Sequence, residues 1–191
     1  EAATADTDGI STAAAVGDGA SLVIGGALAS GGAVTFDQPR NITILSAGDD
    51  SGISFTVTGT DETATAATES ITGANAGTAT GSAYFATITA IAAVGDPAGN
   101  VSAGSGTSIA APMYRGRMRL RGIYVVNTGT AGTTTFSQTS SSGAVAMKFN
   151  TVASANTTQY PDIPDDGILF AAGGYVLYTQ TALSSITVFY S

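Results

Sequence analysis

The sequence predicts an all-β protein with a β-sandwich or jelly-roll-like fold, made of two small β domains in tandem. Three observations support this fold class. Short runs of alternating apolar and hydroxyl residues recur along the chain. Clusters of Gly, Ser, Thr and Ala separate these runs at intervals of roughly eight to twelve residues, as expected between short strands. No segment shows the apolar stripe of an amphipathic helix.

The clearest strand pattern covers residues 53–58, where apolar side chains alternate with hydroxyls and therefore lie on opposite faces. The Ala-rich segment 64–68 tolerates helix, but its Thr content favours an extended chain. The other predicted strands are equally short and rich in β-branched and aromatic residues. In chain order they are 22–24, 34–36, 42–44, 84–91, 123–126, 133–136, 145–149, 175–178 and 186–190.

The composition excludes several kinds of chemistry. The 191-residue chain has a formal net charge of −8 and contains no Cys, His or Trp. Disulfides, thiolate nucleophiles, Cys/His zinc sites, Ser-His-Asp triads and His-ligated haem are therefore impossible. Mean hydropathy is +0.26, yet no run approaches the roughly 18 consecutive apolar residues of a membrane helix. We expect a protein that is not an enzyme, holds no cofactor and binds no membrane.

The charges divide the chain unevenly. Residues 1–112 hold one cation and eleven carboxylates, net −10, whereas residues 113–191 hold five cations and three carboxylates, net +2. The change coincides with a Gly- and Ser-rich, uncharged stretch that ends in Pro, as linkers often do. One continuous sandwich with uneven charge is the alternative. The predicted organisation is an extended N-terminal arm at 1–20, a β domain at 21–104, a linker at 105–112 and a second β domain at 113–191.

Four of the six cations alternate along one short segment as Arg115, Arg117, Arg119 and Arg121. In a strand this spacing places all four guanidinium groups on one face, roughly 7 Å apart. Such a row needs anions opposite it, and the guanidinium fork pairs well with carboxylate or phosphate. The partner is the chain's own acidic half, a carboxylate-rich surface of another subunit, or nucleic acid. Nucleic acid is disfavoured by the sequence pI of about 4.1 and by the lack of interleaved aromatics.

Acidic turns flank the strand at 53–58. Asp49 and Asp50 precede it, and Asp61 and Glu62 follow it. Carboxylates gathered on loops are the ligands that Ca²⁺ prefers, which makes these four residues a weak calcium candidate. Asp and Gly are also what tight turns ordinarily use, and the spacing does not match an EF-hand. No pair of carboxylates is marked out for glycosidase chemistry.

Several strings of strand and turn residues resemble a module of virion proteins from tailed bacteriophages, especially marine ones. In the first half they are 39–44, 46–52, 55–61, 69–73, 75–78 and 84–89. The second half resembles another small phage β module at 121–127, 164–168 and 187–190. This chain departs from the family at 63–66, where it has Thr-Ala-Thr-Ala and family members often have a Gly or polar turn with a charged residue. The family offers no catalytic residue to carry over.

The resemblance implies a structural protein located in the virion, on the capsid surface. We expect a capsid decoration or cement protein that binds the major capsid protein or other virion proteins, forms a homo-oligomer and stabilises the assembled shell by binding only that state. The arginine row is the expected contact strip. A tail, adaptor or fibre component that touches the host surface is one alternative, and a secreted bacterial surface or filament protein is another.

Overall fold

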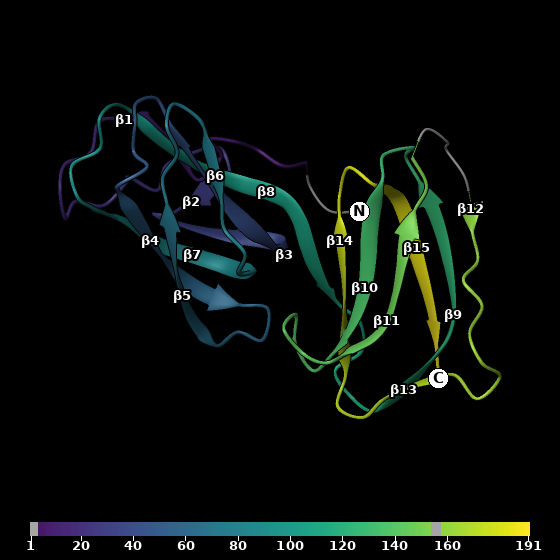
Figure 1. Ribbon diagram of the computed structural model, residues 1–191. Helices are drawn as coiled ribbons and strands as arrows, with labels where there is room; N and C mark the ends of the chain where they lie inside the picture. The colour runs from purple at the N-terminus through teal and green to yellow at the C-terminus, as the bar shows by residue number, and fades with distance from the viewer. Residues whose placement is uncertain (1–3, 154–157) are drawn as a thin grey trace. The chain divides into compact units, whose positions relative to one another are not determined.

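The computed structural model describes residues 4–153 and 158–191, and these ranges contain many strands and no helix (Figure 1). The predicted all-β class, with large antiparallel sheets consistent with a β-sandwich, is confirmed. The chain divides between Thr107 and Ser108 into two compact units, here called the N-terminal and C-terminal units. Whether each unit folds by itself stays a prediction.

The N-terminal unit is built on one antiparallel sheet. Its strands are β1 (Ser11–Ala14), β2 (Ala29–Ser30), β3 (Ala33–Ser46), β4 (Ser54–Asp61), β5 (Ala66–Thr72), β6 (Thr78–Thr80), β7 (Phe85–Val94) and the first part of β8 (Val101–Pro112). The sheet order is β8-β3-β7-β4-β5. The short strand β1 pairs with β8, and the short strands β2 and β6 both pair with β3.

The core of the N-terminal unit follows the alternation expected from the sequence. Phe55 and Val57 on β4 are fully buried, as are Ile88 and Ile91 on β7 beside them. Gly59 lies where the β4–β7 register shifts, and a Cβ there would stand 1.9 Å from the Thr87 carbonyl oxygen. The close approach of β4 and β7 therefore requires glycine at this position.

Three segments differ from the predicted organisation. The expected extended arm at 1–20 is part of the sheet, because it contains β1, which pairs with β8. It also contains the fully buried Ile10, and a buried backbone needs hydrogen bonds such as those of this pairing. Its residues 1–3 lie outside the described range. The expected linker at 105–112 is part of β8, because its small residues suit a largely buried strand. The run 22–24 forms no strand, although Leu22 is buried.

The remaining predicted strands coincide with observed ones, except that Ile53 and Tyr84 lie just before the first residues of β4 and β7. The runs 34–36 and 42–44 belong to one long strand, β3, whose pairing with β7 shifts register between Thr35 and Arg40, around Pro39. Proline lacks the N–H that a regular ladder needs at that point. The Thr-rich segment after residue 64 is extended, as expected, and becomes β5.

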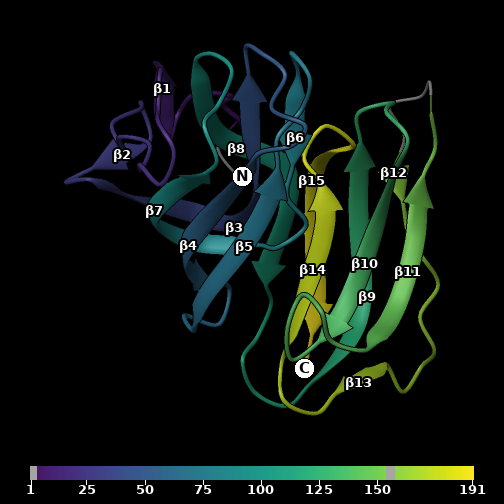
Figure 2. The same cartoon turned by 60° about the vertical axis from the view of Figure 1, so that its left-hand side comes forward.

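The C-terminal unit consists of two antiparallel sheets that share a core. Its strands are the last part of β8, β9 (Met118–Asn127), β10 (Gly132–Gln138), β11 (Val145–Thr151), β12 (Thr158–Gln159), β13 (Ile168–Phe170), β14 (Gly174–Thr179) and β15 (Leu183–Tyr190). One sheet has the order β11-β10-β14-β8; in the other, β9 pairs with β15, β12 and β13. Figure 2 shows β14, β10 and β11 side by side. Phe136 and Val176 of the first sheet pack in one cluster with Leu120 and Val125 of the second, as in a sandwich.

Candidate functional site

The structure divides the arginine row into two pairs. Arg119 and Arg121 lie on β9, whereas Arg115 and Arg117 lie in the bend before β9 begins. The expectation of four guanidinium groups on one face of a strand is therefore wrong for the first two. The backbone bends there because the chain passes from β8 of one sheet to β9 of the other. Arg115, Arg117 and Arg121 are exposed, and Arg119 is half-buried.

The second pair of arginines holds a turn in place. The Nη1 of Arg119 donates to the Asp166 carbonyl oxygen at 2.8 Å, and the Nη1 of Arg121 donates to that of Asp165 at 2.8 Å. The Nε of Arg121 also donates to the Ser191 hydroxyl at 3.0 Å. These guanidinium groups satisfy backbone acceptors of the acidic turn at 164–167. Their first role is to order that turn against β9.

The first pair of arginines has no such role. No hydrogen bond or ion pair of Arg115 or Arg117 occurs among the residues that the structure describes. Within the described residues, these two exposed guanidinium groups therefore leave all their donors available to another molecule. These are the cations of the row that fit an interface best.

Aromatic side chains border the free arginines. The Tyr114 and Tyr190 rings stack with centroids 6.0 Å apart and an interplanar angle of 22°. Both rings remain about half exposed, at 50% and 52%. We call Tyr114, Arg115, Arg117 and Tyr190 the arginine–tyrosine surface. Tyr and Arg are enriched in the centres of protein–protein interfaces, because each combines a large contact area with a polar group.

The backbone under this surface is fixed. The Met113 N–H donates to the Gly174 carbonyl oxygen at 2.9 Å, next to Tyr114. Gly173 has a φ of 91°, and a Cβ there would lie 2.7 Å from the Tyr114 carbonyl oxygen and 3.0 Å from the Arg115 Cα. Only glycine fits this conformation and this approach. The surface is therefore presented by an ordered backbone.

Sequence reasoning missed the tyrosines of this surface. Tyr114 directly precedes the arginines, so the sequence carried a signal there. Tyr190 is 76 positions further along the chain, and only the β9–β15 pairing, with Tyr190 opposite Leu120, brings it close. An aromatic at the end of a predicted strand gives no indication of its partner in space.

The four calcium candidates do not form one site. Asp49 and Asp50 lie in the turn before β4, and Asp61 and Glu62 lie at and after its end. An eight-residue strand spans about 23 Å, so the two pairs are too far apart to share an ion. Among residues 4–153 and 158–191, no group of three or more acidic side chains is placed to hold a metal.

Each acidic turn has a structural explanation of its own. The Asp49 carboxylate accepts hydrogen bonds from the Ser51 hydroxyl at 2.7 Å and from its N–H at 3.2 Å, which lower the pKa of Asp49. Asp50 is fully buried and accepts from the Ala98 N–H at 2.7 Å. Carboxylates that cap turns in this way are typical of tight connections.

The turn between β4 and β5 is held by the Asp61 carboxylate. It accepts from the Thr63 hydroxyl at 2.7 Å, the Thr63 N–H at 2.8 Å and the Thr65 N–H at 3.0 Å. Partial burial acts to raise the pKa of Asp61, but these hydrogen bonds outweigh it and the pKa is lowered. Ala64 takes a φ of 64°, a conformation that usually belongs to glycine.

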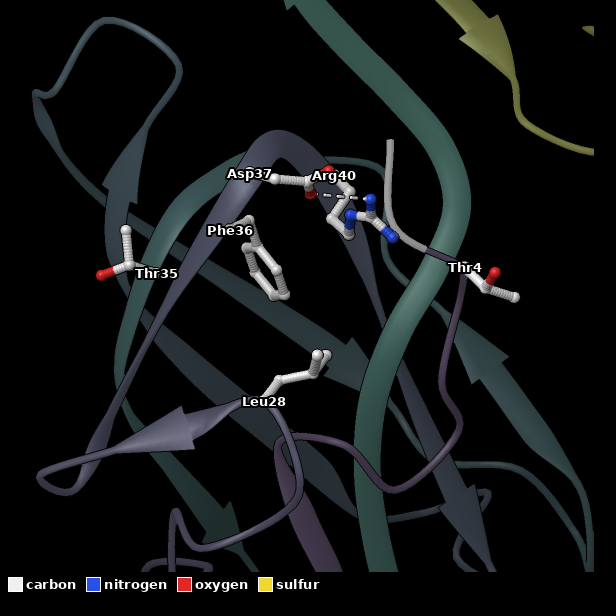
Figure 3. A pocket seen from close by; sticks show the side chains of 6 residues that line it. All are labelled: Thr4, Leu28, Thr35, Phe36, Asp37 and Arg40. Carbon is white, nitrogen blue, oxygen red and sulfur yellow. Dashed lines mark hydrogen bonds and ion pairs between the residues drawn. The ribbon is translucent and has the colours of Figure 1, made fainter. Parts of the chain in front are cut away.

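A small cavity of about 180 Å³ lies in the N-terminal unit (Figure 3). It is lined by Thr4, Leu28, Thr35, Phe36, Asp37 and Arg40. Arg40 is only 1% exposed; its Nη2 pairs with the Asp37 carboxylate at 3.1 Å, and its Cζ lies 5.8 Å from the Phe36 ring centroid. The cation is thus matched by a carboxylate three residues away. We infer that this ion pair stabilises β3 where its pairing with β7 shifts register.

Comparison with known protein families, curated proteins and solved structures finds no match to the chain. The resemblance to phage virion proteins accordingly remains a prediction. The described part of the chain contains no helix long and apolar enough to cross a membrane. The arginine–tyrosine surface is the strongest candidate site.

Proposed function

We propose that the protein is a non-enzymatic structural protein of a phage virion, a capsid decoration protein that binds the assembled shell through the arginine–tyrosine surface. The observation that carries the proposal is this surface itself. It places two unengaged arginines beside two half-exposed, stacked tyrosines on an ordered backbone. The sequence resemblance given above supports the virion as its setting.

The chemistry of the surface indicates an acidic partner. The chain from residue 113 onward is net +2, although the whole chain is net −8. Carboxylates of the major capsid protein would pair with Arg115 and Arg117, while the tyrosine rings would supply desolvated contact area around them. Because such a contact exists only on the assembled shell, binding stabilises that shell by linkage.

The proposal is tested by adding the purified protein to shells that lack it and measuring co-sedimentation. The double variant Arg115→Ala/Arg117→Ala should lose roughly tenfold or more in affinity, since each truncated contact contributes about 1 kcal/mol or more. The loss should shrink as salt rises, because salt screens charge pairs. Both side chains make no bond within the described chain, so the variant should keep the melting temperature of the parent.

Lys148→Ala is the matched control. It removes an exposed cation from the same unit but from β11, outside the arginine–tyrosine surface. We expect its affinity for shells to equal that of the parent. Equal binding by the double arginine variant and the parent would refute the proposed surface. If neither the parent nor any variant binds the shells, the proposed partner is refuted.

A further inference from the structure

The sheet of the N-terminal unit ends in an edge strand, β5, whose outer side pairs with no other strand of the described residues. β5 is the last strand of the order β8-β3-β7-β4-β5, so it pairs with β4 on one side only. Figure 1 shows β5 beside β4 within this unit. All seven of its residues pair with β4 in one unbroken register, from Ala66 opposite Thr60 to Thr72 opposite Ser54. The strand is therefore straight and regular over its whole length.

The hydrogen bonds at both ends of the hairpin show which backbone groups are free. The Asp61 N–H donates to the Thr65 carbonyl oxygen, and the Gly73 N–H donates to that of Ile53. Hydrogen-bonding direction alternates residue by residue in an antiparallel pair. The residues between these ends that point their N–H and C=O toward β4 are thus 67, 69 and 71. Those that point away are 66, 68, 70 and 72.

The residues that point their N–H and C=O groups away from β4 carry only small uncharged side chains, on one face of the sheet. Ala66, Thr68, Ser70 and Thr72 are all exposed. The only charge of the strand, Glu69, is turned inward, where its Oε1 accepts from the Ser82 N–H at 2.6 Å and the Ala83 N–H at 3.1 Å. Among the described residues, no strand occupies the outer side of β5.

Proteins usually protect such edges with Lys, Pro, bulges, inward-pointing charges or very short strands. β11, the edge of the first sheet in the C-terminal unit, has two of these devices. An exposed Lys148 lies near its middle, and its pairing with β10 shifts register between Phe136 and Ser137. β5 has no Lys, no Pro and no bulge, and the carboxylate of its one inward-pointing charge, Glu69, already accepts hydrogen bonds from the Ser82 and Ala83 N–H groups.

We propose that β5 is an assembly edge that pairs antiparallel with β5 of a second copy about a two-fold axis. Pairing would satisfy the free N–H and C=O groups of 66, 68, 70 and 72 in both copies, and a self-complementary edge suits a two-fold contact. Thr and Ser opposite one another form favourable cross-strand pairs. This contact is separate from the arginine–tyrosine surface and goes beyond the proposed function.

Charge restricts the register of the pairing. An axis at Glu69 would place two like charges directly opposite each other, which is unfavourable. An axis at Thr68 or at Ser70 avoids this, since Glu69 then lies opposite Ala67 or Ile71. In either register, the residue on the two-fold axis lies opposite the same residue of the second copy. The two form a hydrogen-bonded pair with Cα atoms about 5.5 Å apart.

The absence of Cys from the chain makes cross-linking decisive. The separation of about 5.5 Å between the Cα atoms of the paired residues permits a disulfide. We expect oxidation to give a disulfide-linked dimer with Thr68→Cys or with Ser70→Cys, but not with Asn150→Cys on the β11 edge. Failure of both β5 variants to cross-link above the level of Asn150→Cys would overturn the proposal.

A second experiment tests the same edge without new bonds. Thr68→Lys/Ser70→Lys places protective charges on β5, and Asn150→Lys/Lys148→Asn moves the existing charge of β11 without removing it. In sedimentation velocity, the parent and the β11 variant should show a dimer that the β5 variant lacks. A parent that is monomeric, or a β5 variant that dimerises like the parent with an unchanged melting temperature, would contradict the pairing.

Discussion

The two units offer different surfaces to other molecules. The C-terminal unit presents charged and aromatic side chains: Arg115 and Arg117, which make no hydrogen bond or ion pair with other described residues, and the Tyr114–Tyr190 stack. The N-terminal unit presents backbone, along an edge flanked by Ala, Thr and Ser. We propose that the first surface selects a partner by charge and that the second pairs with β5 of another copy through backbone hydrogen bonds. One chain thus has the means for two contacts of different physical origin.

Salt should separate these two contacts. Charge pairing by the arginine–tyrosine surface weakens as ionic strength rises, because exposed charges are screened. Pairing of β5 edges brings together two copies that each carry a net charge of −8, so screening of their repulsion should strengthen it. Opposite salt dependences of shell binding and self-association would support two separate surfaces.

The largest effects are expected from matched truncations of the two cores. Phe55→Ala in the N-terminal unit and Phe136→Ala in the C-terminal unit each remove a fully buried ring and should cost about 3–5 kcal/mol. If the units fold independently, calorimetry should resolve two transitions, and each variant should lower only its own. A single transition lowered by either variant would instead show that the units unfold together.

A smaller effect is expected from the turn that precedes the β5 edge. Asp61→Asn should cost about 1 kcal/mol at neutral pH, because the carboxylate accepts three hydrogen bonds there. A lowered folded-state pKa stabilises the fold above the ordinary value of 3.8, and this stabilisation is lost as the pH falls through the folded-state pKa. The difference between parent and variant should therefore shrink below about pH 3.8.

Asp96→Asn is the control for this turn. It removes an exposed carboxylate of the same unit whose side chain makes no hydrogen bond within the described residues. Urea unfolding followed at several pH values gives the comparison. A difference between parent and Asp61→Asn that stays constant down to acid pH would contradict the role assigned to Asp61.

The smallest effect is expected from removing calcium. The candidate carboxylates lie in pairs at opposite ends of β4, and those of Asp49 and Asp61 accept hydrogen bonds from their own turns. EDTA should leave the melting temperature of the isolated protein unchanged. A fall in melting temperature that added Ca²⁺ reverses would restore the calcium hypothesis.

Much of the fold could be predicted from local pattern, and the failures have physical reasons. The alternation of apolar and hydroxyl residues identified β4, because its two faces have different surroundings. The face with Phe55 and Val57 packs into the apolar core. β8 was mistaken for a linker because Gly, Ser and Ala are typical of flexible chain, although they also suit a strand packed closely by its neighbours. Gly106 illustrates this, since a Cβ there would lie 2.3 Å from the Asn41 Oδ1.

The candidate site was predictable only in part. The arginines stand out in any sequence this poor in charge, but their division into a structural pair and a free pair depends on where β9 begins. That start is set by the change of sheet after β8, which no local pattern records. The free edge of β5 was equally hidden, because edge position is a property of strand order and not of the strand.

The proposed role as a decoration protein of a virion shell is tested by quantitative mass spectrometry of purified virions against the major capsid protein. We expect a copy number of the same order as that of the capsid protein or of its symmetric clusters. A handful of copies would instead place the chain at the portal, tail or fibres, and its complete absence from particles would contradict the virion role altogether.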